Sequence, residues 1–334
     1  MGVRPDFRLT VGDDDRSAVI RSRLLRIVVT DNSGEDADTV EIVLDDAGND
    51  IEAPKRGVVL GVSLGYADGA LSYLGRFTVD ETEPEGPPDI LTIRGKAADM
   101  RAGLKAQQTR AWHDTTIGVI VAKIATDHGL TPAVASELAS TAIAHIDQAN
   151  ESDMHFLTRL GRLHGAVAAP KDGRLVFAPA TTGLSVSGQA LPGVVLDRAR
   201  GDLTRWRQVS ADREDHGSVR ARWRDASAGR TRFVTAGSGD PKKTLRNIHP
   251  TQAAAKAAAE AELAKSMRAQ NGVELTIPGR AEIMAQTPFT VRGLREELSG
   301  DWIAETVEHA ADFEGGGFTS RITGRRKADT KKGP

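Results

Sequence analysis

The spacing of apolar residues changes twice along the chain, and these changes limit the folds that it can adopt. In the first hundred residues, apolar and polar positions alternate in short runs separated by turn residues, which is typical of antiparallel β structure. Ala67-Asp68-Gly69-Ala70 predicts a tight hairpin, because Asp-Gly tolerates positive φ angles. The strands expected in this region are Leu24–Thr30, Thr39–Leu44, Val58–Tyr66, Leu71–Glu81 and Ile90–Gly95.

From Asp114 onward the apolar residues follow a helical period. Asp114 or Thr115 is expected to cap a first helix, and Gly129 to end it. A second, short helix is expected to start at Pro132. A third follows Ser152 and ends at a glycine, Gly165. The apolar face of the first helix comprises Ile117, Ile120, Val121 and Ile124, and that of the third comprises Phe156, Leu157, Leu160 and Leu163.

Strand patterns then return, with one long helix among them. Thr251–Gln270 is rich in alanine, glutamate and lysine, which are strong helix formers, and Pro250 and Asn271-Gly272 suit its two ends. The strands expected on either side of this helix are Leu175–Phe177, Val194–Leu196, Gln208–Val209, Val219–Trp223, Val273–Ile277, Phe289–Val291, Trp302–Val307 and Phe318–Gly324.

These patterns predict a β-rich α+β chain in which an α/β unit is inserted between two β regions. The expected divisions are a first antiparallel β-barrel at 1–100, the inserted α/β domain at 101–200, and a second β-barrel at 201–325 that includes helix 251–270. A disordered charged tail is expected at 326–334.

A weak internal echo supports two related β regions. Gly75–Val79 ahead of Ile90–Lys96 resembles Asp301–Val307 ahead of Phe318–Arg325. Either the two regions are related barrels, or two strand-rich segments are similar by chance.

Composition excludes several classes of site. The 334 residues include no cysteine, which removes disulfides, thiolate metal sites and cysteine nucleophiles. No leader pattern or membrane span is expected, so synthesis in the cytoplasm is the default. Residues 31–99 carry sixteen acidic and five basic side chains, whereas residues 198–246 carry thirteen basic and six acidic ones. Such blocks are either solvated faces or surfaces that orient partners or line a channel.

Motifs that would indicate an enzyme occur in the wrong context. Gly61-Val-Ser-Leu-Gly65 matches a nucleophile elbow, but Ser63 lies in an expected strand and not at a turn from strand to helix. The segment starting at Asp31 begins like a calcium loop, but its twelfth position is Ile42 where glutamate is required. No two histidines are three to five residues apart. We therefore expect no catalytic site, no metal and no cofactor.

One segment carries a family resemblance. The stretch from Gln148 to Gly165 resembles the signature Q-x-x-E-S-D-x-x-F-L-x-R-L of the phage late control gene D protein family, and the hub region of VgrG proteins is similar. The order continues through Trp112, His128-Gly129, Lys171–Phe177 and the alanine-rich helix. The family-motif residues are Gln148, Glu151, Ser152, Asp153, Phe156, Leu157, Arg159, Leu160, Trp302 and His309.

Structural roles account for these motif residues. Ser152 is expected to cap a helix, and Asp153 to interact with the positive end of its dipole. The apolar motif residues are expected to be buried, while Gln148, Glu151 and Arg159 fix a turn or a subunit contact. Trp302 and His309 are assigned to a strand and its end in the second barrel.

The resemblance implies a structural baseplate hub of a contractile phage tail, a tail-like bacteriocin or a related injector. It implies a homotrimeric ring in which each chain contributes two tail-tube-like barrels, so that a sixfold tube meets a threefold spike around a central channel. The implied partners are the spike protein, tail tube subunits and other baseplate proteins, with DNA or a tape-measure protein passing through the channel. The implied location is the baseplate of the virion tail or a tail-like particle.

A nucleic-acid-binding module is the alternative from another class. The segment 198–232 places many arginines near Trp206 and Trp223, and arginine with aromatic residues can serve phosphates and bases. The same arginines alternate with apolar residues, as they would on the solvent-exposed face of a sheet. Salt-sensitive DNA binding would distinguish the two interpretations.

Overall fold

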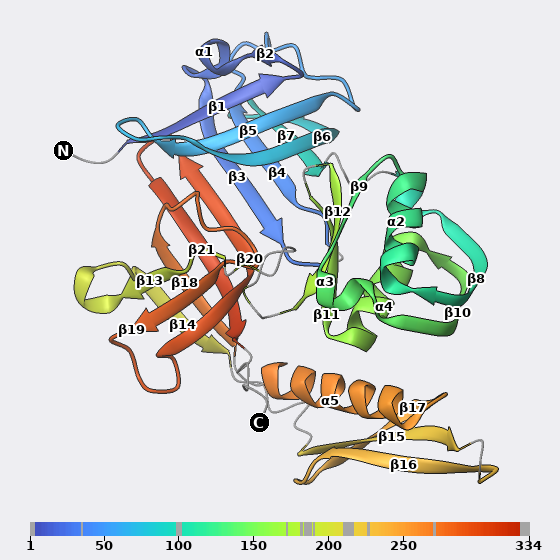
Figure 1. The fold of residues 1–334 in the computed structure, drawn as a ribbon. Helices are drawn as coiled ribbons and strands as arrows, with labels where there is room; N and C mark the ends of the chain where they lie inside the picture. Colours follow the sequence, from blue (N-terminus) through green and yellow to red (C-terminus); the bar gives the residue numbers. More distant parts are fainter. Residues whose placement is uncertain are drawn as a thin grey trace.

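The computed structural model describes residues 4–34, 36–97, 102–171, 173–180, 183, 189, 191–209, 217–225, 228–269 and 272–327. It contains one large sheet, an inserted α/β unit beside that sheet, and a small three-stranded sheet covered by a long helix (Figure 1). The predicted β-rich α+β fold class is confirmed.

The N-terminal β region forms one half of the large sheet, with every strand pair antiparallel in the order β3-β4-β7-β6-β5-β1-β2. All five predicted strands are confirmed, and the Asp-Gly hairpin joins β5 to β6 as expected, with the Gly69 N–H donating to the Tyr66 carbonyl at 3.0 Å. Its elements are β1 (Pro5–Val11), β2 (Asp14–Asp15), α1 (Ser17–Ile20), β3 (Leu24–Asn32), β4 (Thr39–Asp45), β5 (Val59–Tyr66), β6 (Ser72–Glu85) and β7 (Ile90–Ala97).

The C-terminal β region completes the same sheet. Strand β20 pairs with β21 on one side and with β3 on the other, so the ends of the chain share a single 13-stranded sheet. The strands predicted here are confirmed. The elements of this region are β13 (Val194–Asp197), η2 (Arg198–Arg200), β14 (Arg205–Val209), β18 (Gly272–Pro278), β19 (Pro288–Arg292), β20 (Gly300–Asp312) and β21 (Gly317–Arg326).

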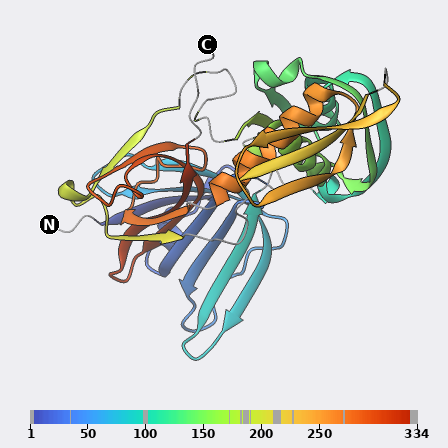
Figure 2. The same ribbon diagram turned by 90° about the horizontal axis from the view of Figure 1, so that it is seen from below.

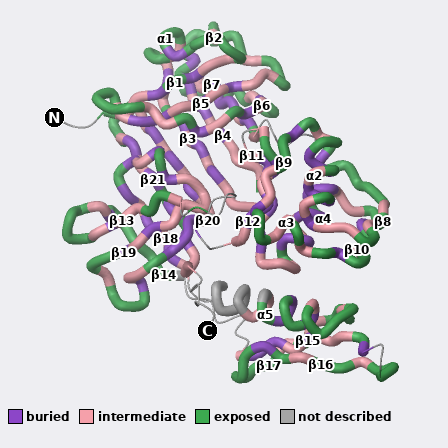
Figure 3. Tube along the Cα trace, in the orientation of Figure 1, coloured by how far each residue is buried: buried purple, intermediate pink, exposed green. Residues whose placement is uncertain are grey.

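Alternate residues of these strands bury their side chains, which produces the striped pattern of Figure 3. The core of the N-terminal region includes Phe7, Ile27 and Phe77, and it also takes in Ala311 and Phe318 from β20 and β21. Fully burying an aliphatic or phenylalanine side chain contributes about 1.5–3 kcal/mol. The two regions are therefore joined by packing as well as by backbone hydrogen bonds.

The inserted unit folds around a core of its own, which includes Ile120, Phe156 and Phe177. The predicted helix at Pro132 is wrong. Residues Thr131–Val134 form an edge strand parallel to β12. Pro132 has no backbone N–H, but on an edge strand this removes no hydrogen bond from the sheet. The elements of this unit are η1 (Ala102–Lys105), β8 (Gln107–Thr116), α2 (Ile117–Asp127), β9 (Thr131–Val134), α3 (Ser136–Ala139), β10 (Ala142–Ser152), α4 (Asp153–His164), β11 (Ala166–Lys171) and β12 (Arg174–Pro179).

A smaller unit lies between β14 and β18 in the sequence. Its three strands have the order β16-β15-β17, and the predicted alanine-rich helix, here α5, covers one face. Val219, Ala221 and Ala236 pack against Ala255 and Ala259 of the helix. The small side chains allow close approach of helix and sheet. Its elements are β15 (Ser218–Asp225), β16 (Arg230–Gly237), β17 (Lys242–His249) and α5 (Gln252–Ala269).

Candidate functional site

The face of the large sheet opposite the two cores is polar across both β regions. Arg94 of β7 donates to Glu41 of β4 at 3.0 Å and to Glu83 of β6 at 2.6 Å. On β21, the guanidinium of Arg321 lies 3.9 Å from Glu308 of β20. In both groups the carboxylates outnumber the arginine that they surround. Such a surface is suited to broad contact or to lining an aqueous passage.

The family-motif residues lie in the inserted unit, where the end of β10 leads into α4. Gln148 is fully buried, and its amide donates to Asp153 and to the Glu151 carbonyl, both at 2.8 Å. Its amide oxygen accepts from Arg110 of β8 at 2.9 Å. Asp153 also accepts from Arg110 and lies 2.8 Å from the Nε2 atom of His128. This network ties α4, β8, β10 and the end of α2 together.

A second set of contacts surrounds the first turn of α4. The Ser152 hydroxyl accepts from the His155 N–H at 3.2 Å, so Ser152 is the helix cap that the sequence predicts. Glu151 accepts three hydrogen bonds from Arg159, at 2.7, 3.0 and 3.2 Å, and this arginine also donates to the Asp147 carbonyl at 2.7 Å. These contacts fix the turn from strand to helix.

The apolar motif residues complete that arrangement. Phe156, Leu157 and Leu160 are fully buried in the core of the inserted unit. The ring of Phe156 stacks on Trp112 of β8 with centroids 6.2 Å apart. Gly165 adopts a φ of 65° at the end of α4, in the left-handed region that favours glycine. All eight motif residues between 148 and 160 therefore lie together.

Trp302 and His309 lie elsewhere, on β20 in the C-terminal region. Trp302 is fully buried, and its indole N–H donates to the Leu298 carbonyl at 3.0 Å. His309 is also fully buried, 2.8 Å from the Ser320 hydroxyl and 3.0 Å from the Ile283 carbonyl. Burial lowers the pKa of His309, so its ring is neutral. With no solvent access, this histidine and serine hold the loop before β19.

A buried charge cluster joins the inserted unit to the large sheet, and the sequence did not reveal it. Lys171, at the end of β11, donates to Asp31 of β3 and to Asp38 at 2.6 Å. Asp31 accepts a further hydrogen bond from the Ala285 N–H at 2.7 Å. Asp31, the first residue of the segment that begins like a calcium loop, lies on β3 and continues its buried positions after Ile27 and Val29.

Burial and the neighbouring carboxylate set the charges in this cluster. Burial raises the pKa of Asp38 to about 6, with Lys171 opposing and Asp31 adding to that increase. Burial alone would lower the pKa of Lys171, but Asp31 and Asp38 outweigh it and raise the pKa. The lysine therefore stays charged, and Asp38 is the group that takes up a proton first.

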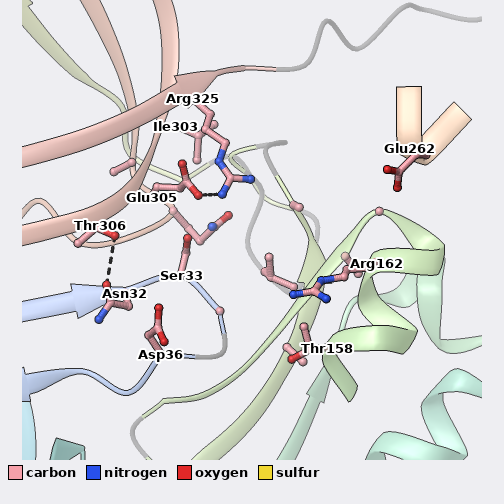
Figure 4. Close-up of a pocket in the computed structure, with 18 residues that line it drawn as sticks. Asn32, Ser33, Asp36, Thr158, Arg162, Glu262, Ile303, Glu305, Thr306 and Arg325 are labelled. Atoms are coloured by element: carbon pink, nitrogen blue, oxygen red, sulfur yellow. Dashed lines mark hydrogen bonds and ion pairs between the residues drawn. The ribbon is translucent and has the colours of Figure 1, made fainter. Parts of the chain in front are cut away.

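A cleft of about 420 Å³ opens where the inserted unit, α5 and the two β regions approach one another (Figure 4). An ion pair between Arg325 and Glu305 lies at one wall, and the Thr306 hydroxyl donates to the Asn32 side chain at 3.1 Å. Arg162 of α4 lines the other wall. The cleft marks the junction of separate parts of the chain.

The enzyme interpretations gain no support from these positions. Ser63 lies within β5, paired with Arg8 and Tyr73 on neighbouring strands, and not on a turn from strand to helix. In the part of the chain that the structure describes, no three His, Asp or Glu side chains are grouped to hold a metal ion. None of the described helices is long and apolar enough to span a bilayer.

The arginines proposed for nucleic-acid binding fall in two separate places. Arg198 stacks on Trp206 of β14 at 4.8 Å, at the end of the large sheet. Those of 220–232 lie on the small sheet, where Trp223 packs toward α5 and Arg232 pairs with Asp225 at 2.8 Å. The segment therefore forms no single surface that combines all its arginines with both tryptophans.

Solved structures with this architecture include two tail proteins. The 43 kDa tail protein of prophage MuSo2 from Shewanella oneidensis has a TM-score of 0.71 at 16% identity, covering 96% of this chain and 98% of that one. The tail protein of Neisseria meningitidis MC58 has a TM-score of 0.73 at 13% identity, with coverages of 97% and 96%. A type VI secretion component of E. coli shares the fold less closely, at a TM-score of 0.56 and 14% identity over 92% of this chain and 74% of that one. The fold is therefore that of tail proteins.

Sequence comparison narrows this class to one family. Probable baseplate hub proteins of Escherichia phages 186 and P2 are 33% and 34% identical to the chain, over 95% of its length and 92% of theirs. Residues 39–314 match the phage tail baseplate hub family. The chain belongs to this family, which confirms the resemblance seen in the signature after Gln148.

Proposed function

We propose that the chain is a non-enzymatic hub that forms a homotrimeric ring and adapts a sixfold tail tube to a threefold spike. The observation that carries the proposal is the shared 13-stranded sheet, in which β20 bonds directly to β3. Two β regions fused in one sheet present two tube-like units per chain. Three chains then present six such units at one end and three equivalent chains at the other.

The polar face of the large sheet supports a channel inside this ring. Its carboxylates outnumber the arginines beside them, as at Arg94 and Arg321, so the face would not hold a polyanion such as DNA. A passing polymer would meet no strong binding site on such a lining. DNA or a tape-measure protein can then move through the ring, which stays in the baseplate of the virion tail or tail-like particle after assembly in the host cytoplasm.

The partners in this proposal are the spike, tail tube subunits and other baseplate proteins, bound through broad surfaces. The test is the native mass of the purified chain, alone and mixed with the spike and tube proteins. A mass of three chains in the complex supports the ring. A mass that remains that of one chain with both partners bound, or two β regions that fail to superimpose, contradicts it.

A further inference from the structure

Two parts of the chain project from the body with opposite charge. The first is the tip of the β6–β7 hairpin, which extends away from the rest of the molecule in Figure 2. Residues 80–90 hold five carboxylates and no basic side chain, and residues 83–88 are all exposed. Arg94 pairs with Glu81 and Glu83, and Lys96 pairs with Asp80, so Glu85 and Asp89 at the end of the hairpin carry its remaining negative charge. We call residues 80–90 the acidic tip.

The second part is the face of the small sheet that α5 leaves uncovered. Residues 218–249 hold eight basic and two acidic side chains, of which Arg232 pairs with Asp225, and Lys243 pairs with Glu262 of α5. Because alternate residues of a strand point to opposite faces, the packing of Val219 and Ala221 against α5 places Arg220, Arg222 and Arg224 on the other face. We call this surface, with Phe233 and Ile248, the basic face.

Apolar side chains lie among these arginines. Phe233 of β16 and Ile248 of β17 both pair with Arg222 in the strand register, so they share its face, and they are 47% and 54% exposed. The Arg220 guanidinium lies 3.6 Å above the Phe233 ring. Exposed aromatic and aliphatic residues surrounded by arginine are typical of protein interfaces, where such residues often dominate the binding energy.

We infer that the basic face of one copy of this chain docks the acidic tip of a second copy. The tip offers Glu85 and Asp89 together with three prolines, and these match a surface of arginines around Phe233 and Ile248. Figure 2 shows the tip and the small sheet on separate sides of the molecule, so one chain does not satisfy both. A contact between two different patches repeats head to tail and closes into a ring where its rotation allows. The inference thus rests on the proposed trimer and locates its contact.

A nucleic acid fits the basic face less well than this protein partner. Sequence-tolerant binding of single strands needs aromatic rings on which bases stack. The Phe233 ring already carries the Arg220 guanidinium, and Trp223 is packed toward α5. The acidic tip provides carboxylates of the required sign on the same chain, so nucleic acid becomes an outcome of the test.

Cross-linking of the full chain tests the contact directly. The chain has no cysteine of its own, so Glu85→Cys and Phe233→Cys introduce the only thiols. In the complex with spike and tube proteins, oxidation of the double variant should link three chains covalently, and a mixture of the two single variants should give linked pairs. A complex with the mass of three chains but no link between these positions would overturn the docking contact and leave the ring standing. Absence of the trimer itself would instead overturn the proposed function.

Charge reversal gives a second, independent readout. Arg220→Glu with Arg224→Glu, or Glu85→Lys with Asp89→Lys, should each raise the trimer dissociation constant about tenfold or more, and combining both pairs should restore assembly. Lys105→Glu with Arg174→Glu changes the net charge equally at exposed sites of the inserted unit and should leave assembly unchanged. If reversing the basic face abolishes oligonucleotide binding by the full chain and leaves the trimer intact, the occupant is nucleic acid and the inference fails.

Discussion

Replacing Lys171 with methionine tests whether the buried charge cluster holds the inserted unit to the large sheet. The side chains of Asp31 and Asp38 are only 4% and 14% exposed, so without the ammonium group two carboxylates face each other with little water. Removing one partner of a buried ion pair typically costs about 3–5 kcal/mol. Because Lys171 is 31% exposed, we expect a loss of stability at the lower end of this range, about 3 kcal/mol at pH 7.5.

The loss should depend on pH, because Asp38 can take up a proton. Its pKa of about 6 exceeds the ordinary 3.8, so its contribution to stability is full below pH 3.8 and is lost as the pH rises through 6. Without Lys171 the pKa of Asp38 rises further, so the stability of the variant continues to fall above pH 6, by about 1.4 kcal/mol per pH unit. At pH 5 Asp38 is protonated in both the wild type and Lys171→Met, so the difference between their free energies of unfolding should shrink to about 1 kcal/mol.

Urea unfolding of the wild type and Lys171→Met at pH 5.0 and 7.5, followed by circular dichroism, measures both values. Lys105→Met removes an exposed lysine from the same unit and should cost less than about 0.5 kcal/mol at either pH. An equal loss for Lys171→Met at the two pH values would refute the assignment of the titrating group to Asp38. A loss below about 1 kcal/mol at pH 7.5 would refute the role of the cluster in stability.

Two further substitutions test the other buried networks. Asp153→Ala removes the acceptor shared by Arg110, Gln148 and His128 and should cost about 3 kcal/mol in urea unfolding. Asp147→Ala, at a side chain 62% exposed on the preceding strand β10, should be near neutral, and equal losses would contradict the network's role. His309→Ala should cost about 3 kcal/mol in thermal unfolding through a cavity and lost hydrogen bonds. Because burial lowers its pKa, His309 contributes stability above pH 6.5 that is lost as the pH falls; a variant with unchanged pH dependence would contradict this.

The strands of the large sheet could be predicted because one of their faces is buried. Strand β4 alternates strictly and β3 does so from Ile27 onward, and the sequence predicted the first residues of β3, β4 and β7 without error. Strand β8 was missed because most of Gln107–Thr116 is exposed and its side chains follow no apolar period. That strand is specified by its pairing with β10 and by the network at Arg110, which are tertiary contacts.

The candidate sites could be predicted only where their contacts are local in sequence. The signature from Gln148 to Leu160 is local, so its residues could be expected to lie together, and the cap at Ser152 follows from helix physics alone. The cluster of Lys171 with Asp31 joins residues 140 positions apart. Nothing local pairs these two residues. A carboxylate in phase with buried Ile27 and Val29 was nevertheless a sign that Asp31 needs a buried partner.

The pairing of β20 with β3 has a consequence for the order of events during synthesis. The partner of Asn32 in this ladder is Thr306, so one edge of β3 stays open until nearly the whole chain has left the ribosome. Contacts between residues so distant in sequence form slowly, and an open strand edge invites pairing with other nascent chains. Chains cut short before β20 should therefore aggregate. The sheet that joins the two halves also makes folding a single event, completed only when the last strands emerge.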